Sequence, residues 1–89
     1  MASMLVKHQV KDFAAWKRVY DSVADLRTSS GELSDTIYRD VNDSKSLTIM
    51  FTWDSIENAQ KYAQSSELRA AMEKAGVEGK LNISFLKEF

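Results

Sequence analysis

The first third of the chain changes from a strand-like to a helix-like pattern of hydrophobic positions. Residues 4–10 are mostly β-compatible, and Asp12 then offers a carboxylate that can cap the N-terminus of a helix. Beyond it, apolar residues recur at steps of three and four, which is typical of one helix face: Phe13, Trp16, Val19, Tyr20, Val23 and Leu26. We predict a strand over residues 4–10 and a helix that ends before Gly31, which would supply a left-handed cap.

The middle of the chain reads as a β-hairpin. Residues 36–41 and 47–53 are rich in β-branched and aromatic side chains. Residues 42–45 between them are a polar cluster of the kind that forms turns. Two strands joined by this turn are therefore expected.

The last third repeats the order of a helix followed by a strand. Asp54 stands three residues before Glu57, which predicts a carboxylate cap at the start of a second helix. Ser65 and Ser66 are expected to restart this helix, which then runs to Gly76. Its predicted buried side comprises Ile56, Ala59, Ala63, Leu68, Ala71, Met72 and Ala75. Alternation over residues 81–86 predicts a final strand.

The resulting order, β-α-β-β-α-β, predicts a ferredoxin-like α+β fold in a single domain over residues 1–89. Right-handed crossovers would place two helices on one face of an antiparallel four-stranded sheet. Odd-numbered strand positions are expected under the helices: Leu47, Ile49, Phe51, Trp53, Leu81, Ile83 and Phe85. Even-numbered positions face away and form a mixed surface that fits a pocket wall: Tyr38, Thr48, Met50, Thr52, Asn82, Ser84 and Leu86.

Composition removes several classes of function. The chain has 89 residues, no cysteine and a formal net charge of −1. Disulfides, thiolate nucleophiles and iron–sulfur clusters are therefore excluded, and a nucleic-acid partner is not expected because basic residues are not clustered. No apolar run is long enough to span a membrane. A core this small is marginal alone, which favours a homodimer that pairs through the uncovered sheet face.

The beginning of the chain lacks the basic and apolar segments of a secretory signal. We therefore expect a cytoplasmic protein. Residues 1–3 are interpreted as an extension ahead of Met4.

Several short stretches together resemble a known family. They are residues 6–10 followed by Asp12, Phe13 and Trp16, then residues 51–54, and then residues 66–69 through Met72 to residues 75–77. Their order and spacing resemble the antibiotic biosynthesis monooxygenase-like proteins of the dimeric α+β barrel superfamily. The resemblance implies a ferredoxin-like protomer whose sheet meets that of a second copy to form a barrel, with a ligand cavity in each subunit.

The same resemblance implies chemistry on a small molecule but does not select a reaction. The superfamily includes cofactor-independent oxygenases of aromatic compounds, haem-degrading enzymes, cyclases and isomerases. Haem-degrading relatives use a histidine of the second helix as iron ligand, and residues 55–75 contain none. We therefore expect no cofactor and no metal.

His8 is the only histidine and the first catalytic candidate. Its ordinary pKa near 6.5 suits a general base. Alternatively, it shares parity with Met4, Val6 and Val10 and is a hydrogen-bonded residue at the layer edge. Tyr38, the second catalytic candidate, can donate a hydrogen bond to a substrate carbonyl or enolate, or else pack the dimer.

The remaining candidates have structural alternatives of their own. Thr48, Met50, Thr52, Asn82, Ser84 and Leu86 are the predicted substrate-binding residues. Trp16 and Trp53 can stack on an aromatic ligand but are expected in the core. Arg27 and Arg69 can bind a carboxylate but are expected to be solvated near helix ends.

Three classes of function stay open. The chain is an enzyme acting on a hydrophobic or aromatic metabolite without metal (a cofactor-independent oxygenase, cyclase or isomerase), a noncatalytic small-molecule binder, or an RNA-binding sheet module. The last lacks exposed aromatic residues on its central strands. Turnover of a bound aromatic compound under oxygen separates the first two.

Overall fold

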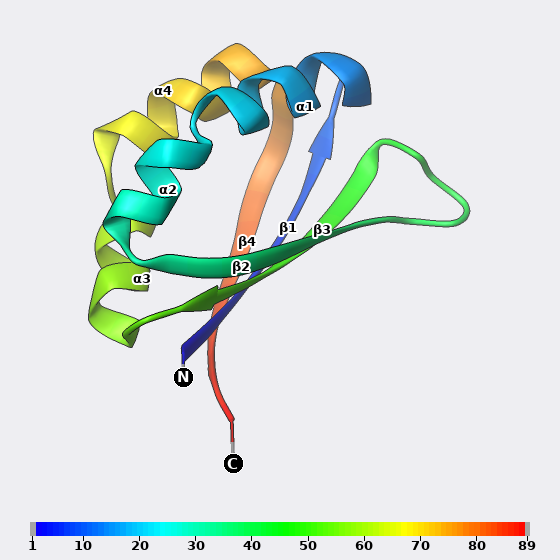
Figure 1. Cartoon of the computed structure of the whole chain (residues 1–89). Coiled ribbons are helices and arrows are strands. Elements are labelled where there is room, and N and C mark those ends of the chain that lie inside the picture. Colours follow the sequence, from blue (N-terminus) through cyan, green and yellow to red (C-terminus); the bar gives the residue numbers. More distant parts are fainter. Residues whose placement is uncertain (1, 89) are drawn as a thin grey trace.

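A twisted antiparallel sheet carries the helices on one face and leaves the other face bare (Figure 1). The computed structural model describes residues 2–88, which form four strands and four helices. In chain order these are β1 (Ala2–Val10), α1 (Phe13–Ser22), α2 (Ala24–Ser30), β2 (Glu32–Arg39), β3 (Ser46–Trp53), α3 (Ile56–Ala63), α4 (Ser66–Ala75) and β4 (Val77–Lys87). The sheet order β2-β3-β1-β4 confirms the predicted ferredoxin-like fold. Within the described residues, no helix is long and apolar enough to cross a membrane.

The predicted N-terminal cap is present in the first helical segment but not in the second. Asp12 caps α1 as predicted, because its Oδ2 accepts a hydrogen bond from the Ala15 amide at 3.1 Å. The prediction that Asp54 caps the second helical segment is wrong by one residue, since Ser55 accepts from the Asn58 amide at 3.1 Å. The Asp54 amide instead donates to the Gly31 carbonyl at 2.9 Å and holds Asp54 beside the sheet edge.

Both predicted helices are divided in two. The break between α3 and α4 at Ser65 was expected, and Ser65 caps the new helix by accepting from the Leu68 amide. The break between α1 and α2 at Val23 was not expected. The left-handed cap predicted at Gly31 is not formed, since Gly31 has φ of 122° and lies against the Asp54 carboxylate, where a side chain would collide. Gly76, at the end of α4, is the residue that adopts a left-handed cap, with φ of 74°.

The strands are longer than their patterns predicted. β1 begins at Ala2, so Ala2 and Ser3 pair with β3 and β4, while Met1 lies outside the described residues. β4 begins directly after Gly76 rather than at residue 81. Between the pairs Lys7–Asn82 and Gln9–Glu78, the single residue His8 lies opposite residues 79–81 of β4, which form a bulge.

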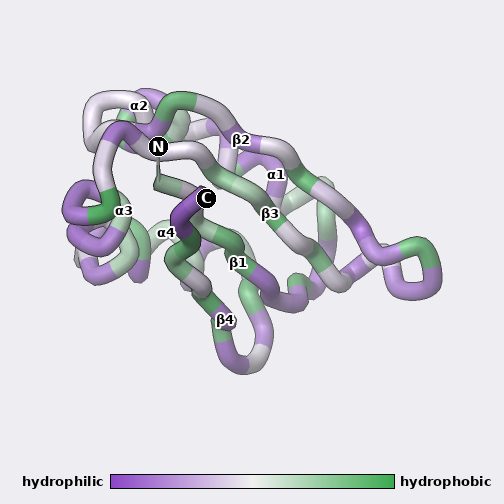
Figure 2. The backbone as a smooth tube through the Cα atoms, turned by 90° about the horizontal axis from the view of Figure 1, so that it is seen from below, coloured by the Kyte–Doolittle hydropathy of each residue, from purple (hydrophilic) through white to green (hydrophobic). Residues whose placement is uncertain are grey.

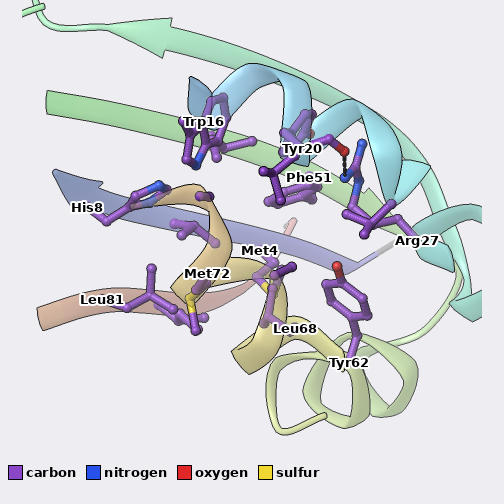
Figure 3. Close-up of a pocket in the computed structure, with 17 residues that line it drawn as sticks. Met4, His8, Trp16, Tyr20, Arg27, Phe51, Tyr62, Leu68, Met72 and Leu81 are labelled. Atoms are coloured by element: carbon purple, nitrogen blue, oxygen red, sulfur yellow. Dashed lines mark hydrogen bonds between the residues drawn. The ribbon is translucent and has the colours of Figure 1, made fainter. Parts of the chain in front are cut away.

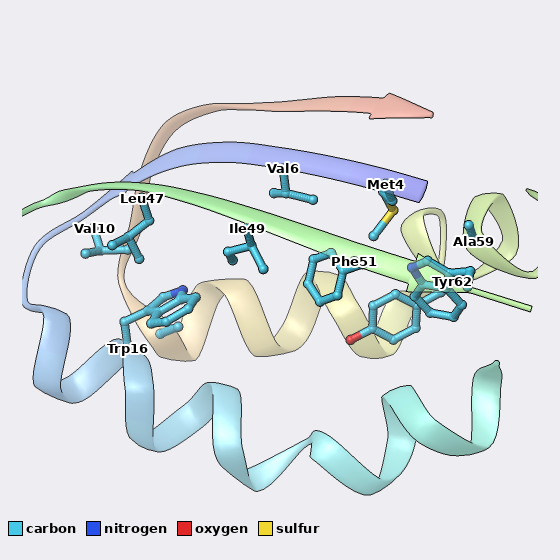
Figure 4. Packing of buried hydrophobic residues seen from close by; sticks show 11 residues of the cluster. Met4, Val6, Val10, Trp16, Leu47, Ile49, Phe51, Ala59 and Tyr62 are labelled. Atoms are coloured by element: carbon cyan, nitrogen blue, oxygen red, sulfur yellow. The ribbon is translucent and has the colours of Figure 1, made fainter. Parts of the chain in front are cut away.

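The core lies between the sheet and the helices (Figure 4). Leu47, Ile49, Phe51 and Trp53 are all buried there, which confirms the predicted parity of β3. On β4 the pattern is weaker, because Leu81 and Ile83 are half-buried and Phe85 is exposed. Trp16 and Trp53 both belong to the core, as predicted.

The opposite face of the sheet is not covered by any element of residues 2–88 (Figure 2). Its central positions are Leu5 of β1 and Met50 of β3, which are paired across the two strands. Tyr38 and Leu86 are exposed at its margins. The result is a mixed apolar and polar surface that has no partner within the chain.

Candidate functional site

A narrow apolar cavity of about 70 Å³ lies between the covered face of the sheet and the helices (Figure 3). The walls come from β1, β3, β4 and helices α1 to α4, and the lining residues are Met4, Val6, His8, Trp16, Val19, Tyr20, Val23, Arg27, Ile49, Phe51, Tyr62, Leu68, Ala71, Met72, Ala75, Leu81 and Ile83. The lining combines many aliphatic and aromatic side chains with a few polar groups, which is typical of small-molecule sites.

His8 lies at one end of this cavity beneath α1 (Figure 3). Its side chain is 8% exposed, and among residues 2–88 neither ring nitrogen has a hydrogen-bond partner. Burial lowers the pKa of His8 below its ordinary value of 6.5, because the charged form loses solvation. The imidazole is therefore neutral at pH 7 and has a free nitrogen to accept a proton.

His8 has the orientation expected of a core histidine, but it lacks the hydrogen bonds expected of one. Its side chain follows strand alternation and faces the helices with Met4, Val6 and Val10. The bulge opposite it belongs to β4 and does not turn it to the bare face. Because neither nitrogen is paired within the described residues, its polar groups are not used by the fold.

Aromatic side chains form one wall of the cavity from His8 inward. The ring centroids of His8 and Trp16 are 5.7 Å apart, and Trp16 stacks on Tyr20 at 4.8 Å. Phe51 continues the wall, with its centroid 6.5 Å from that of Tyr20. The rings are tilted against one another, by 47° between His8 and Trp16, so the wall offers apolar and edge contacts to an aromatic ligand.

A buried polar cluster lies at the other end of the cavity, around Arg27 (Figure 3). Arg27 is 4% exposed, its Nε donates to Glu32 at 2.7 Å and its Nη1 donates to the Tyr20 carbonyl at 2.7 Å. Its guanidinium lies over the Tyr20 ring at 3.6 Å, and Tyr20 donates its hydroxyl to Asp35. The expectation that Arg27 is solvated is wrong, whereas Arg69 is exposed as expected.

Tyr62 stands beside Arg27 and separates the cavity from a second hollow. Its side chain is 5% exposed, and burial raises the pKa of its hydroxyl while the nearby Arg27 charge opposes that rise. The second hollow, of about 320 Å³, lies between α2 and α3 and is lined mainly by polar residues. Tyr62 lines both spaces, so it lies between the second hollow and the Arg27 end of the cavity.

Of the predicted catalytic and substrate-binding residues, His8 alone borders the cavity, which is also lined by Trp16 and Arg27, expected as core and solvated residues. The pairing brings Tyr38, Thr48 and Asn82 into one row across the sheet with Lys7, on the bare face where these three residues were expected. Thr48, Met50 and Thr52 are half-buried on that face, and Tyr38, Asn82, Ser84 and Leu86 are exposed there. A role for these residues in binding therefore depends on a second molecule that covers them.

The sequence contains a signal for the burial of two polar residues of the cavity, Arg27 and Tyr62. Tyr20, Val23 and Arg27 follow one another at steps of three and four, which places Arg27 on the apolar face of its helix. Tyr62 follows Ala59 by three residues and lies on the same buried side. A charged or hydroxyl-bearing residue within an apolar stripe is thus the sequence feature that indicates this cluster.

The arrangement can bind a flat hydrophobic molecule and remove a proton from it. The side chains around His8 are mainly apolar, which strengthens polar interactions between His8 and a ligand. A neutral histidine with a free nitrogen is a suitable general base near neutral pH. The buried hydroxyl and guanidinium groups at the other end can fix the orientation of the ligand.

Solved structures with the same fold extend over nearly the whole chain. A proposed antibiotic biosynthesis monooxygenase from Bordetella bronchiseptica superimposes with a TM-score of 0.82 at 11% identity, covering 99% of this chain and 96% of that one. SnoaB, a cofactor-independent oxygenase from Streptomyces nogalater, gives 0.79 at 10% identity, with 99% and 92% covered. A conserved protein from Methanosarcina mazei Go1 gives 0.77 at 15% identity, with 100% and 94% covered.

No protein-family model and no curated protein matches the sequence. At these identities the superpositions establish the fold. The chain is thus a ferredoxin-like α+β protein with the fold of the antibiotic biosynthesis monooxygenase-like proteins, as the sequence resemblance implied.

Proposed function

We propose that this protein is a cofactor-independent oxygenase that acts on a flat hydrophobic or aromatic metabolite in the cavity between sheet and helices. The observation that carries the proposal is His8, a buried and neutral base whose nitrogens are unpaired within residues 2–88, at the end of an aromatic-walled cavity. The fold shared with SnoaB, a cofactor-independent oxygenase, supports the reaction type.

The proposed reaction begins when His8 accepts a proton from an acidic C–H of the bound ligand. The resulting carbanion, conjugated with an aromatic ketone, supplies the electrons that reduce molecular oxygen. For an anthrone, one oxygen atom of O₂ becomes the new carbonyl of the quinone and the other leaves as water with the two hydrogens of the oxidised carbon. No external reductant is required, because the ligand itself is oxidised.

Oxygen consumption with 9-anthrone tests the proposal. The wild-type protein should accelerate oxygen uptake and quinone formation above the spontaneous rate, and His8→Gln should lower kcat/KM by about 10²–10⁴-fold, as is typical when a general base is removed. Leu47→Val is the matched control, because Leu47 is fully buried opposite His8 on β3 but does not line the cavity. It should reduce stability with little effect on the rate.

The other outcomes separate the alternatives. If wild type binds anthrone but does not accelerate its oxidation, the protein is a noncatalytic binder of the kind that the sequence left open. If Tyr38→Phe abolishes turnover while His8→Gln does not, the active site lies on the bare sheet face, and the cavity proposal is wrong. Binding is measured without oxygen, so that affinity and turnover are determined separately.

We also propose that the protein works as a homodimer through the bare sheet face. Leu5 and Met50 at the centre of that face, with Leu86 at its margin, form apolar surface for which residues 2–88 provide no cover. Pairing of two such faces would bury this surface and enclose Thr48, Thr52, Asn82 and Ser84 between the sheets.

A further inference from the structure

We infer that Arg27 and Tyr62 bind an uncharged carbonyl oxygen of the ligand, at the end of the cavity opposite His8. This inference rests on the proposed function, since it names the polar group that the cavity ligand carries. It assigns to these two residues the selection of neutral ketones and quinones over carboxylates.

The first support is the spare hydrogen-bonding capacity of Arg27. Its Nε and Nη1 are engaged by Glu32 and by the Tyr20 carbonyl. Its Nη2 makes no hydrogen bond as short as these within residues 2–88 and lies 4.0 Å from a carboxylate oxygen of Asp35, while the guanidinium also interacts with the Tyr62 hydroxyl. A buried guanidinium with a free N–H at a cavity wall is a strong hydrogen-bond donor.

The second support is the position of Tyr62. Its hydroxyl points toward Arg27, and both residues line the same cavity (Figure 3). A phenolic hydroxyl beside a guanidinium can direct a second hydrogen bond to one acceptor oxygen. Because both side chains are almost fully buried, water does not compete strongly for this position.

The balance of charge in the cluster decides which acceptor is preferred. One guanidinium faces two carboxylates, Glu32 and Asp35, so the cluster has no surplus positive charge. A ligand carboxylate would bring a third negative group into a buried site. Its desolvation penalty would exceed its attraction to one guanidinium that already faces two carboxylates. An uncharged carbonyl gains the hydrogen bonds without that cost.

The distance between the two ends restricts the shape of the ligand. Met4, which lies between His8 and Arg27 in Figure 3, is four residues from His8 on β1, roughly 13 Å along an extended strand, so the two ends are at least that far apart. A ligand that reaches both ends must therefore be elongated. The carbonyl that Arg27 and Tyr62 bind is then a second polar group at its far end, separate from the ketone that acidifies the C–H beside His8. Leu68 and Met72 of α4 border the cavity and are half-buried, and a methionine can adapt to such a ligand.

Calorimetric titration with three matched probes tests the inference: 2-acetylnaphthalene, 2-ethylnaphthalene and 2-naphthoate. We expect wild type to bind the ketone about tenfold more tightly than the hydrocarbon, the equivalent of one good hydrogen bond to a charged donor. The carboxylate should bind more weakly than the ketone. Tyr62→Phe and Arg27→Lys should each reduce or remove the preference for the ketone while leaving affinity for the hydrocarbon nearly unchanged.

The outcomes distinguish this inference from the proposed function. If both variants keep the wild-type ratio of ketone to hydrocarbon affinity, or if wild type prefers the carboxylate, the inference is wrong while the cavity still binds ligands. If none of the three probes binds wild type, the cavity is not a ligand site and both proposals fall. Unchanged hydrocarbon affinity in each variant shows that it has folded, and Tyr62→Phe removes only a hydroxyl should Arg27→Lys be too unstable to measure.

Discussion

At the scale of single residues, the properties of His8 follow from its position on the covered side of β1. The sequence places His8 among alternating apolar residues, and the fold buries it without giving its nitrogens a partner within residues 2–88. Most buried polar groups in proteins are paired, and a buried imidazole without a partner lowers the stability of the fold. Catalysis or ligand binding is the use that we propose for it.

This environment predicts how stability depends on pH. Unfolded His8 titrates near 6.5, whereas burial lowers the pKa in the folded state. Below pH 6.5 the unfolded state therefore binds the proton first, and the folded state loses at most about 1.4 kcal/mol for each pH unit. We expect the melting temperature of wild type to fall more steeply than that of His8→Gln between pH 7.5 and 5.5. Equal slopes would show that His8 is solvated when folded.

Trp53 gives the second prediction at this scale. The side chain is fully buried, and its Nε1 has no partner among residues 2–88. Trp53→Ala should lower the free energy of unfolding by about 3–5 kcal/mol, measured by denaturant titration. Trp53→Phe should cost clearly less, because it keeps an aromatic ring and removes the unpaired N–H. If Trp53→Ala instead melts like wild type while binding no ligand, Trp53 belongs to the site and not to the core.

The sequence predicted which positions of β3 are buried, because strict alternation leaves a single solution for Leu47, Ile49, Phe51 and Trp53. It did not predict that Arg27 is buried. A guanidinium is usually solvated near a helix end, and its burial here depends on Glu32 and the Tyr20 carbonyl, which only the folded chain brings to it. Long-range partners of this kind have no local pattern.

At the scale of elements, Arg27 links three segments. It lies on α2, forms its ion pair with Glu32 at the start of β2, and donates to a carbonyl in the last turn of α1. The carbonyl groups of a last helical turn lack partners inside their own helix. The unexpected break at Val23 is therefore stabilised by a side chain that lies beyond it.

This link predicts a large effect of Glu32. Glu32→Ala leaves the Arg27 charge buried without its close partner and should lower the free energy of unfolding by about 3 kcal/mol, the lower end of the usual range because Asp35 remains nearby. Asp21→Ala is the control, since it removes the exposed ion pair with Lys17 and should cost less than about 1 kcal/mol. Equal costs in denaturant titrations would contradict a structural role for the Arg27–Glu32 pair.

The order of elements was predictable, whereas the cavity between the sheet and the helices was not. The mixed character of Thr48, Met50 and Thr52 indicated a pocket wall, whereas the structure has its apolar cavity among core residues. Sequence patterns identify buried positions but not the gaps between them. A cavity depends on how side chains such as Met72 and Ile83 meet across layers.

At the scale of the whole molecule, the two faces of the sheet pose different physical problems. One is covered by four helices and contains both the core and the cavity. The other presents Leu5, Met50 and Leu86 outward from a chain of 10.1 kDa, whose core is small for independent stability. Assembly through the bare face would protect these residues from water and add buried area to the fold.

Sedimentation measurements test the proposed assembly. Wild type at micromolar concentration should have about twice the 10.1 kDa mass of the chain. Met50→Asp places a carboxylate at the centre of the face, where pairing would bury it without a partner, and should shift the protein to monomers. Val41→Asp is the control, because Val41 is 97% exposed in the hairpin loop and should leave the mass unchanged. If wild type stays a monomer at every concentration, the bare face is not a dimer interface. If it dimerises and Met50→Asp does not dissociate it, two copies meet through a different surface, and the bare face is free to bind something else.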